Sequence, residues 1–108
     1  MKLLWLLVNC HSVTEAKKIG EAALKKRLTS CYDIFPRSLT RYFWPPKTGR
    51  IASARGCLLI IATLPKHLKK LQKLVQSKHS DRVPFVGTVE IKNINPDYYK
   101  WLLSEIKK

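Results

Sequence analysis

Apolar positions recur along this chain with helical spacing in some stretches and as strand-like runs in others. Residues 3–10 form a nearly continuous apolar run, which predicts a buried first strand. Ser12-Val13-Thr14-Glu15 follows and matches the S-x-x-E capping box, with Ser12 as the N-cap and Glu15 reaching back. We therefore expect a helix that starts after Ser12 and runs to about Leu28. Its buried face is predicted to hold Ala16, Ile19, Ala23 and the stem of Arg27.

A long hairpin is predicted over residues 31–63, and the rest of the chain is organised around it. The first arm, residues 32–44, is rich in aromatic and β-branched residues. Pro45, Pro46 and Gly49 supply the reversal, because proline cannot donate to a ladder and glycine tolerates positive φ. The second arm contains an apolar run typical of a strand buried on both faces. Because a two-stranded ribbon is not stable alone in water, we expect helices on one face and another subunit at its edge.

A second helix and a further strand are predicted after the hairpin. Pro65 suits a first helical position, and the helix that it opens is expected to end near His79. Residues 83–91 then alternate as a strand, in which Gly87 marks a bulge or a close approach. The apolar stripe of the second helix is formed by Leu64, Leu68, Leu71 and Val75.

The end of the chain predicts a short helix over residues 98–107, because Asn95-Pro96-Asp97 supplies an N-cap, a first-position proline and a first-turn acid. The element order is then β-α-β-β-α-β-α. Its first six elements are the split β-α-β arrangement of ferredoxin-like folds. We expect one α+β domain over residues 1–108, an antiparallel sheet with two helices on one face, a long hairpin and an extra C-terminal helix. The other sheet face is left bare, which indicates an oligomer.

Charge adds a second feature to this picture. The chain of 108 residues has 21 Lys and Arg against 7 Asp and Glu, a formal net charge of +14. Such a field attracts polyanions, so a basic nucleic-acid-binding module is one alternative and a solvated lysine-rich surface is another. Residues 57–61 have none of the stacking aromatics of RNA-recognition strands, which disfavours the nucleic-acid alternative.

The three cysteines, Cys10, Cys31 and Cys57, are widely spaced and form no C-x-x-C pair. We expect reduced thiols in a cytoplasmic protein. The opening run MKLLWLLV is too short for a signal peptide, and no stretch approaches the roughly 20 apolar residues that span a bilayer. No P-loop, HExxH or nucleophile-elbow motif is present, so we do not expect an enzyme.

Four motifs follow one another along nearly the whole chain. They are C-Y-D-I-F-P from Cys31, S-L-T-R-Y-F-W ending at Trp44, H-x-x-x-V-P from His79 and N-P-D-Y-Y-K-W from Asn95. In this order they resemble the CutA-type divalent-cation tolerance proteins. The resemblance implies a ferredoxin-like fold, a homotrimer built through the hairpin and strand edges, and association with copper and other divalent cations. It also implies kinship in shape with the PII signalling proteins.

The chain departs from the family pattern where acids are common. Residues 52–55 read Ala-Ser-Ala-Arg, and the stretch after His79 lacks the family's tyrosine and glutamate. We therefore expect a site for a soft or borderline ion such as copper or zinc rather than for a hard cation.

Candidate metal ligands lie at the end of the first strand and the end of the second helix. Cys10 and His11 precede a helix N-terminus, whose field favours a thiolate, and Cys with His suits soft ions. The resemblance implies that His79 is a metal contact. The alternative is that Cys10 is a half-buried structural residue, His11 a surface residue, and His79 a histidine favoured at a helix C-terminus.

Two further sets of residues carry weaker hypotheses. Guanidinium groups grip phosphate or carboxylate, so a PII-like, small-anion-binding trimer is an alternative function. Its arginines would be Arg37, Arg41, Arg50 and Arg55. Large aromatics at the hairpin and the terminal helix are typical of subunit-interface anchors. Those anchors are predicted to be Tyr42, Trp44 and Trp101. The function we expect is a non-enzymatic, homotrimeric protein that binds a divalent metal ion, copper foremost.

Overall fold

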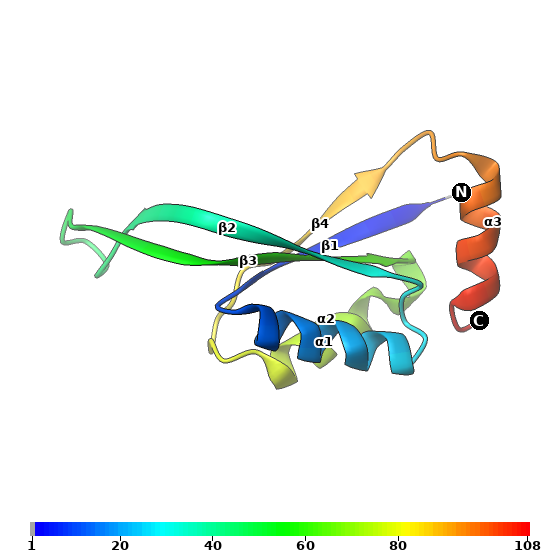
Figure 1. Cartoon of the computed structure of the whole chain (residues 1–108), viewed down its shortest axis with the longest axis horizontal. Coiled ribbons are helices and arrows are strands. Elements are labelled where there is room, and N and C mark those ends of the chain that lie inside the picture. Colours follow the sequence, from blue (N-terminus) through cyan, green and yellow to red (C-terminus); the bar gives the residue numbers. More distant parts are fainter. Residues whose placement is uncertain (1) are drawn as a thin grey trace.

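The computed structural model describes residues 2–108 as a four-stranded sheet with three α-helices (Figure 1). Helices α1 and α2 lie under one face of the sheet, and α3 stands at its end beside the N-terminus. The elements are β1 Leu3–Cys10, α1 Val13–Lys25, β2 Tyr32–Phe43, β3 Ile51–Thr63, a 3₁₀ turn Pro65–His67, α2 Leu68–Lys78, β4 Val86–Ile91 and α3 Pro96–Glu105.

The sheet order is β2-β3-β1-β4, and every neighbouring pair is antiparallel. β1 and β2 are consecutive strands in the sequence, joined through α1, but they are not neighbours in the sheet because β3 lies between them. This order, with the predicted element sequence, confirms the α+β, ferredoxin-like fold. The register places Leu6 opposite Ile61 and Cys10 opposite Cys57, so both cysteines point to the helix-covered face.

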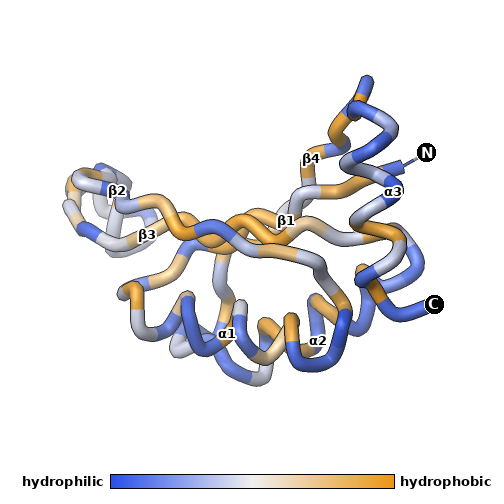
Figure 2. The backbone as a smooth tube through the Cα atoms, turned by 45° about the vertical axis from the view of Figure 1, so that its right-hand side comes forward, coloured by the Kyte–Doolittle hydropathy of each residue, from blue (hydrophilic) through white to orange (hydrophobic). Residues whose placement is uncertain are grey.

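The main core lies between the sheet and the two helices, as the orange stretches of the strands facing them show (Figure 2). Ala16, Ile19 and Ala23 of α1 are fully buried as predicted, and so are Leu71 and Val75 of α2. The prediction that Leu64 belongs to the stripe of the second helix is wrong, because α2 starts at Leu68 and Leu64 packs outside this core. A smaller hydrophobic cluster packs α3 against the sheet at the end where β1 begins. It is formed by Leu3, Ala62, Leu64, Leu102 and Ile106.

Helix α1 ends at Lys25, earlier than the predicted Leu28. Arg27 adopts φ 54°, which breaks the helix and turns the chain so that the Leu28 amide donates to the Ala23 carbonyl at 3.1 Å. The Arg27 side chain therefore leaves the buried face and pairs with Glu105 at 3.1 Å. The prediction that its stem belongs to the core face is wrong.

Strand β4 starts at Val86 rather than at position 83, and Val83 is 84% exposed. Pro84 cannot donate to a ladder, so the alternation that precedes it does not become a paired strand. Gly87 carries no bulge, because the β1–β4 register runs through it without a shift. It does mark a close approach: a Cβ at this position would lie 3.1 Å from the Phe85 ring.

The C-terminal helix starts at Pro96 and ends at Glu105, so it lies about two residues earlier than the predicted range. Asn95 is its N-cap as expected, although its side chain makes no capping hydrogen bond.

The hairpin of β2 and β3 extends past the ends of the other strands, at the left of Figure 1. A register shift between Arg37 and Thr40 bends it at the point where β1 ends. Beyond that point neither face is covered, and Phe43 and Trp44 at the tip are 71% and 58% exposed. The apolar arm inside the sheet is buried as predicted, with Leu59 and Ile61 fully covered.

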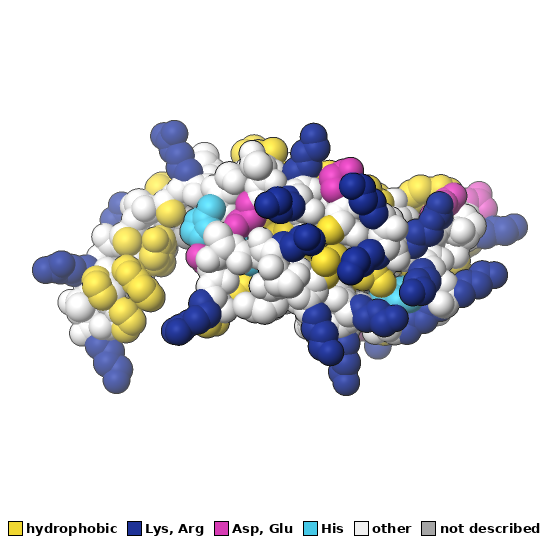
Figure 3. All heavy atoms as spheres, turned by 90° about the horizontal axis from the view of Figure 1, so that it is seen from below, with side chains coloured by type: hydrophobic (Ala, Val, Ile, Leu, Met, Phe, Trp, Pro, Cys, Tyr) yellow, Lys and Arg dark blue, Asp and Glu magenta, His cyan; other side chains and the backbone are white. Residues whose placement is uncertain are grey.

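The sheet face opposite α1 and α2 is apolar and largely bare. Trp5, Phe35 and Val89 lie on it and are between 38% and 51% exposed. The helix face differs sharply, because lysine and arginine side chains cover it (Figure 3). Among residues 2–108, no helix is long and apolar enough to cross a membrane.

Candidate metal centre

The chain between β1 and α1 is held by a reciprocal set of hydrogen bonds. The Ser12 hydroxyl accepts from the Glu15 amide at 3.1 Å, which confirms Ser12 as the N-cap. The Glu15 carboxylate reaches back one residue further than a standard capping box requires. Its Oε1 accepts from the His11 amide at 3.1 Å, and its Oε2 accepts from the Ser80 amide at 2.8 Å. Glu15 therefore ties the start of α1 to the loop that follows α2.

His79 is buried where α2 ends, and both of its ring nitrogens are engaged. Nδ1 accepts from the Asp81 amide at 3.0 Å. Nε2 lies 2.6 Å from the Asn9 carbonyl oxygen, which can only accept, so Nε2 carries the proton. The imidazole is thereby fixed in one orientation against β1.

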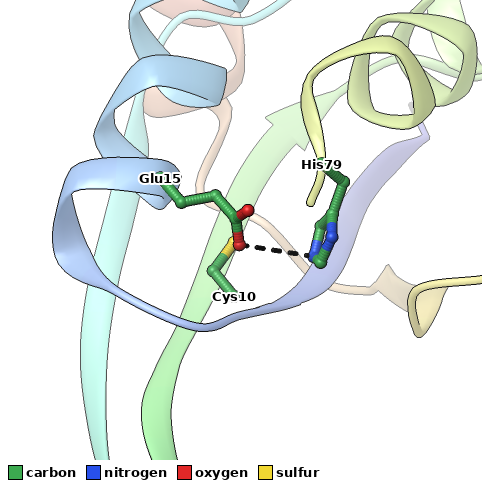
Figure 4. Close-up of side chains that lie close together, drawn as sticks. All are labelled: Cys10, Glu15 and His79. Atoms are coloured by element: carbon green, nitrogen blue, oxygen red, sulfur yellow. Dashed lines mark ion pairs between the residues drawn. The ribbon is translucent and has the colours of Figure 1, made fainter. Parts of the chain in front are cut away.

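Cys10, Glu15 and His79 converge at one point, the end of β1 (Figure 4). Their ligand atoms all lie within 4.8 Å of one another, and Glu15 Oε1 is 3.7 Å from His79 Nε2. The three side chains come from β1, from the first turn of α1 and from the end of α2. A sulfur, an oxygen and an imidazole nitrogen meet there, the donor types that Zn²⁺ and Cu²⁺ accept and that Mg²⁺ and Ca²⁺ do not favour.

The Glu15 carboxyl is the charged member of this group. Burial raises its pKa, but the hydrogen bonds from Ser80 and from the His11 amide, with the nearby His79, outweigh that effect. The net pKa of Glu15 lies below its ordinary value. The carboxylate is therefore ionised at neutral pH and available to a cation.

Cys10 behaves differently from the sequence-based expectation. Burial, the neighbouring Cys57 and the Glu15 charge raise the pKa of the Cys10 thiol to about 12. The expectation that the helix N-terminus favours a thiolate is wrong, because burial foremost, and then Cys57 and the negative charge of Glu15, favour the neutral thiol. Without a metal, Cys10 is a neutral thiol.

His11 lies next to the cluster but outside it. Its Nε2 pairs with Asp81 Oδ1 at 2.7 Å on the surface, and its ring centroid is 6.1 Å from that of His79. The hydrogen bond to Asp81 raises the pKa of His11, while partial burial opposes the shift. The ligand group of the structure thus contains Cys10 and His79 and replaces the proposed helper His11 with Glu15.

The four candidate anion-binding arginines are spread along the hairpin instead of meeting at one site. Arg37 donates to Thr40 at 2.5 Å, and Arg41 donates to Ser53 at 3.3 Å. Arg50 precedes β3 at the tip, roughly 20 Å from Arg37 at the usual rise of about 3.3 Å per strand residue. Arg55 lines a shallow hollow with uncharged side chains, Leu39 among them, and no second arginine.

The predicted interface aromatics lie on two separate parts of the chain. Tyr42 and Trp44 belong to the outer hairpin, and Trp101 lies on α3 with its ring 5.5 Å from that of Tyr98. All three are between 42% and 58% exposed in the single chain. Their assignment to a subunit interface stays a prediction.

Glu15 is the member of the cluster that sequence reasoning missed. It was assigned to the capping box alone, and it does accept there from the chain before α1. The signal for a second role was the short connection between β1 and α1. Only two residues separate the strand from the helix, so a side chain in the first turn of the helix can face back over the end of the strand.

The fold and this cluster define a ferredoxin-like protein with a mixed sulfur, oxygen and nitrogen site at the end of its central strand. A sequence profile described as "CutA1 divalent ion tolerance protein" matches residues 4–105. The chain belongs to the CutA1 family, which confirms the resemblance seen in its motifs.

Curated relatives show how far the similarity extends. A CutA homolog of Danio rerio is 33% identical over 101 residues, covering 94% of this chain and 65% of that protein. A divalent-cation tolerance protein CutA of Pyrococcus horikoshii is 28% identical, covering 86% of this chain and 87% of its own length. The chain spans 65% and 61% of the Danio rerio and Xenopus laevis relatives.

Solved structures agree with the fold. The crystal structure of CutA1 from Oryza sativa has a TM-score of 0.90 at 25% identity, with 100% of this chain and 96% of that chain covered. The Cut A1 protein of Thermus thermophilus has a TM-score of 0.87 at 26% identity, with 97% and 99% covered.

Proposed function

We propose that this chain binds a borderline divalent cation, copper(II) or zinc, through Cys10, Glu15 and His79, and that it does so as a non-enzymatic protein. The observation that carries the proposal is the convergence of three different donor atoms within 4.8 Å at the end of β1. The family description, divalent ion tolerance, supports the same class of ligand. The cytoplasmic location expected from the sequence stays a prediction.

Binding at this site has a defined chemical requirement. The Cys10 thiol must lose its proton. His79 must give up the hydrogen bond from Nε2 to Asn9, and its ring proton must move to Nδ1, which then no longer accepts from the Asp81 amide. Glu15 is already ionised and offers the first charge to an arriving cation. The proton that Cys10 loses leaves with solvent, so affinity is expected to rise with pH.

The direct test is equilibrium dialysis against Cu(II). The double variant Cys10→Ala/His79→Ala is expected to lose at least about 100-fold in affinity, because removal of a single supporting group of a metal site already costs about 10–100-fold. A double variant that binds as much copper as the parent would contradict the proposal.

A matched control uses another cysteine and another histidine. The variant Cys31→Ala/His11→Ala removes the same two residue types, but neither lies in the three-ligand group. Its affinity is expected to stay within about threefold of the parent, a difference of less than 1 kcal/mol. An equal loss in both double variants would show that the metal is not bound at Cys10 and His79.

We also propose that the protein is a homotrimer, with the bare sheet face and the hairpin in the interfaces. Trp5, Phe35 and Val89 leave large apolar side chains exposed on one face of the sheet in a chain that is otherwise strongly charged. The unpaired edge of β2 and the projecting hairpin provide further surfaces for strand and side-chain contacts.

The trimer is tested by native mass spectrometry. The parent is expected at three times the 12.5 kDa chain mass. Phe35→Glu places a charge on the bare face and is expected to shift the population towards monomer, because burying an unpaired carboxylate is costly. A parent that is monomeric at micromolar concentration would contradict the proposal. A trimer unaffected by Phe35→Glu would exclude the bare face as the interface.

A further inference from the structure

Cys57 lies beside the proposed cation site but is not one of its three ligands. It occupies β3 directly opposite Cys10 on β1, and both side chains are 1% exposed under α1. Directly opposed residues of an antiparallel pair have Cα atoms about 4.5–5.5 Å apart, so the two sulfurs share one small space. The Cys57 thiol donates to the Ser12 carbonyl at 3.3 Å, and the proximity of Cys57 raises the pKa of the Cys10 thiol.

Two facing thiols change the chemistry that this end of β1 offers. Thiolate is the soft ligand that selects Cu(I) over harder and more highly charged ions. One Cu(I) ion and two thiols give a dithiolate complex and release two protons, with no change in oxidation state and no other reactant. The product carries one net negative charge close to the ionised Glu15 carboxylate, so this buried site accepts it only with a compensating cation.

Arg37 supplies that compensation. It lies on β2 opposite Gly56, the residue before Cys57, and its positive charge acts on both thiols. One end of its guanidinium is anchored by Thr40 at 2.5 Å. Its Nε–H is buried and has no hydrogen-bond partner among residues 2–108. An Arg37 nitrogen lies 3.0 Å from where a Cβ of Gly56 would be, next to the end of β1. A buried donor without a partner at this place can serve an anionic group.

We propose that Cys10 and Cys57 together hold monovalent copper as a dithiolate, with Arg37 as its counter-charge. The inference rests on the proposed cation-binding function and deepens it, since Cys10 then serves both sets of ligands. Cys57 turns a mixed-donor site for divalent ions into one that also binds copper supplied in its monovalent state. Glu15 and His79 belong to the divalent set, and Cys57 belongs to the monovalent set.

The experiment is a pair of anaerobic competition titrations on the full chain, after alkylation has shown that the thiols are reduced. Bicinchoninate competes for Cu(I), and a zinc-responsive chelator competes for Zn(II). Cys57→Val keeps a buried apolar side chain of similar size, and Cys57→Ala guards against a packing defect in the first variant. Cys31→Ser is the matched control, because Cys31 is half-buried outside the cluster.

The ratio of Cu(I) to Zn(II) affinity is expected to fall about 100-fold in both Cys57 variants, since a lost ligand costs at least as much as a lost supporting partner. Cys31→Ser should keep the parent ratio. X-ray absorption at the copper edge should show two sulfur neighbours in the parent and one in Cys57→Val, a change that a packing role for Cys57 would not produce.

The outcomes separate the two proposals. If the parent binds Zn(II) or Cu(II) and the Cys57 variants have the Cu(I) affinity of the parent, this inference is overturned and the proposed divalent site is unaffected. A single sulfur neighbour in the Cu(I)-loaded parent overturns it equally. Parent protein that takes up Cu(I) through Cys57 but no divalent ion overturns the proposed divalent function alone.

Discussion

Alanine in place of Glu15 is expected to lower the free energy of unfolding by about 2 kcal/mol at pH 7, since hydrogen bonds to a charged group contribute about 1.5–3 kcal/mol each and part of the site stays accessible to water. The variant leaves the amides of His11 and Ser80 without their acceptor. It also removes the one charged ligand of the proposed divalent site. Chemical unfolding at a fixed protein concentration measures the first effect, and Cu(II) dialysis measures the second.

The pH dependence of this effect follows from the lowered pKa of Glu15. Because the folded pKa lies below the unfolded one, the carboxylate contributes its full stabilisation at pH values above the unfolded pKa of about 4.3. The contribution is lost as pH falls through the lower folded pKa. The stability difference between parent and Glu15→Ala is therefore expected to be constant from pH 7 to about pH 5 and to shrink under more acidic conditions.

Glu90→Ala is the matched control for Glu15→Ala. Glu90 is a strand glutamate that, within residues 2–108, makes a single ion pair, a surface contact with Lys2 at 3.8 Å. Its loss should change stability by less than about 0.5 kcal/mol at every pH. If Glu15→Ala and Glu90→Ala cost the same, the hydrogen bonds of Glu15 do not hold α1 to the loop after α2.

Alanine in place of Gly56 is the second large effect that we expect, with a loss of about 1–3 kcal/mol in the free energy of unfolding, the usual range for overpacking. A Cβ at this position would lie 2.5 Å from the Cys10 carbonyl oxygen and 3.0 Å from an Arg37 nitrogen. The first contact is with backbone, which cannot rotate away, so β1 and β3 must separate at their end. That separation displaces Cys10, and both copper affinities should fall with it.

Ser53→Ala provides the comparison for Gly56→Ala. Ser53 lies on the same strand and is exposed, and its hydroxyl accepts from the Arg41 side chain at 3.3 Å. Its replacement should leave both stability and metal affinity within the error of the measurements. Wild-type copper affinity in a folded Gly56→Ala protein would show that the spacing of β1 and β3 at Cys10 does not matter for binding.

The fold was predictable from the sequence because its signals are periodic and local. The first strand has the predicted bounds, Leu3–Cys10, since an unbroken apolar run ends where a capping box starts. The errors fall where a single backbone angle or a tertiary contact decides. Nothing in the sequence marks Arg27 as the residue with φ 54° that ends α1. The order of the strands followed from the element order, because few arrangements connect such elements.

The site was only half predictable, for a different physical reason. Cys10 and His79 were candidates because of their residue types and their match to a family motif. Glu15 was hidden by its capping role. The protonation state of the Cys10 thiol depends on burial and on the Glu15 carboxylate, whose position is fixed in part by the Ser80 amide, 65 residues further along the chain. The pairing of Cys10 with Cys57 needs the register of β1 and β3, which the sequence pattern does not specify to the residue.

The engagement of both His79 nitrogens has a consequence for the speed of metal capture. A cation that reaches Glu15 and Cys10 finds the imidazole still bonded to Asn9 and to the Asp81 amide. The His79 ring must lose these hydrogen bonds before it can bind the cation. If that step is rate-limiting, the rate of capture is expected to level off as metal concentration rises. Ions that leave Glu15 quickly depart before the ring opens, and slowly dissociating ions remain. At the proposed site, cations are then expected to be selected by how long they stay as well as by how tightly they bind.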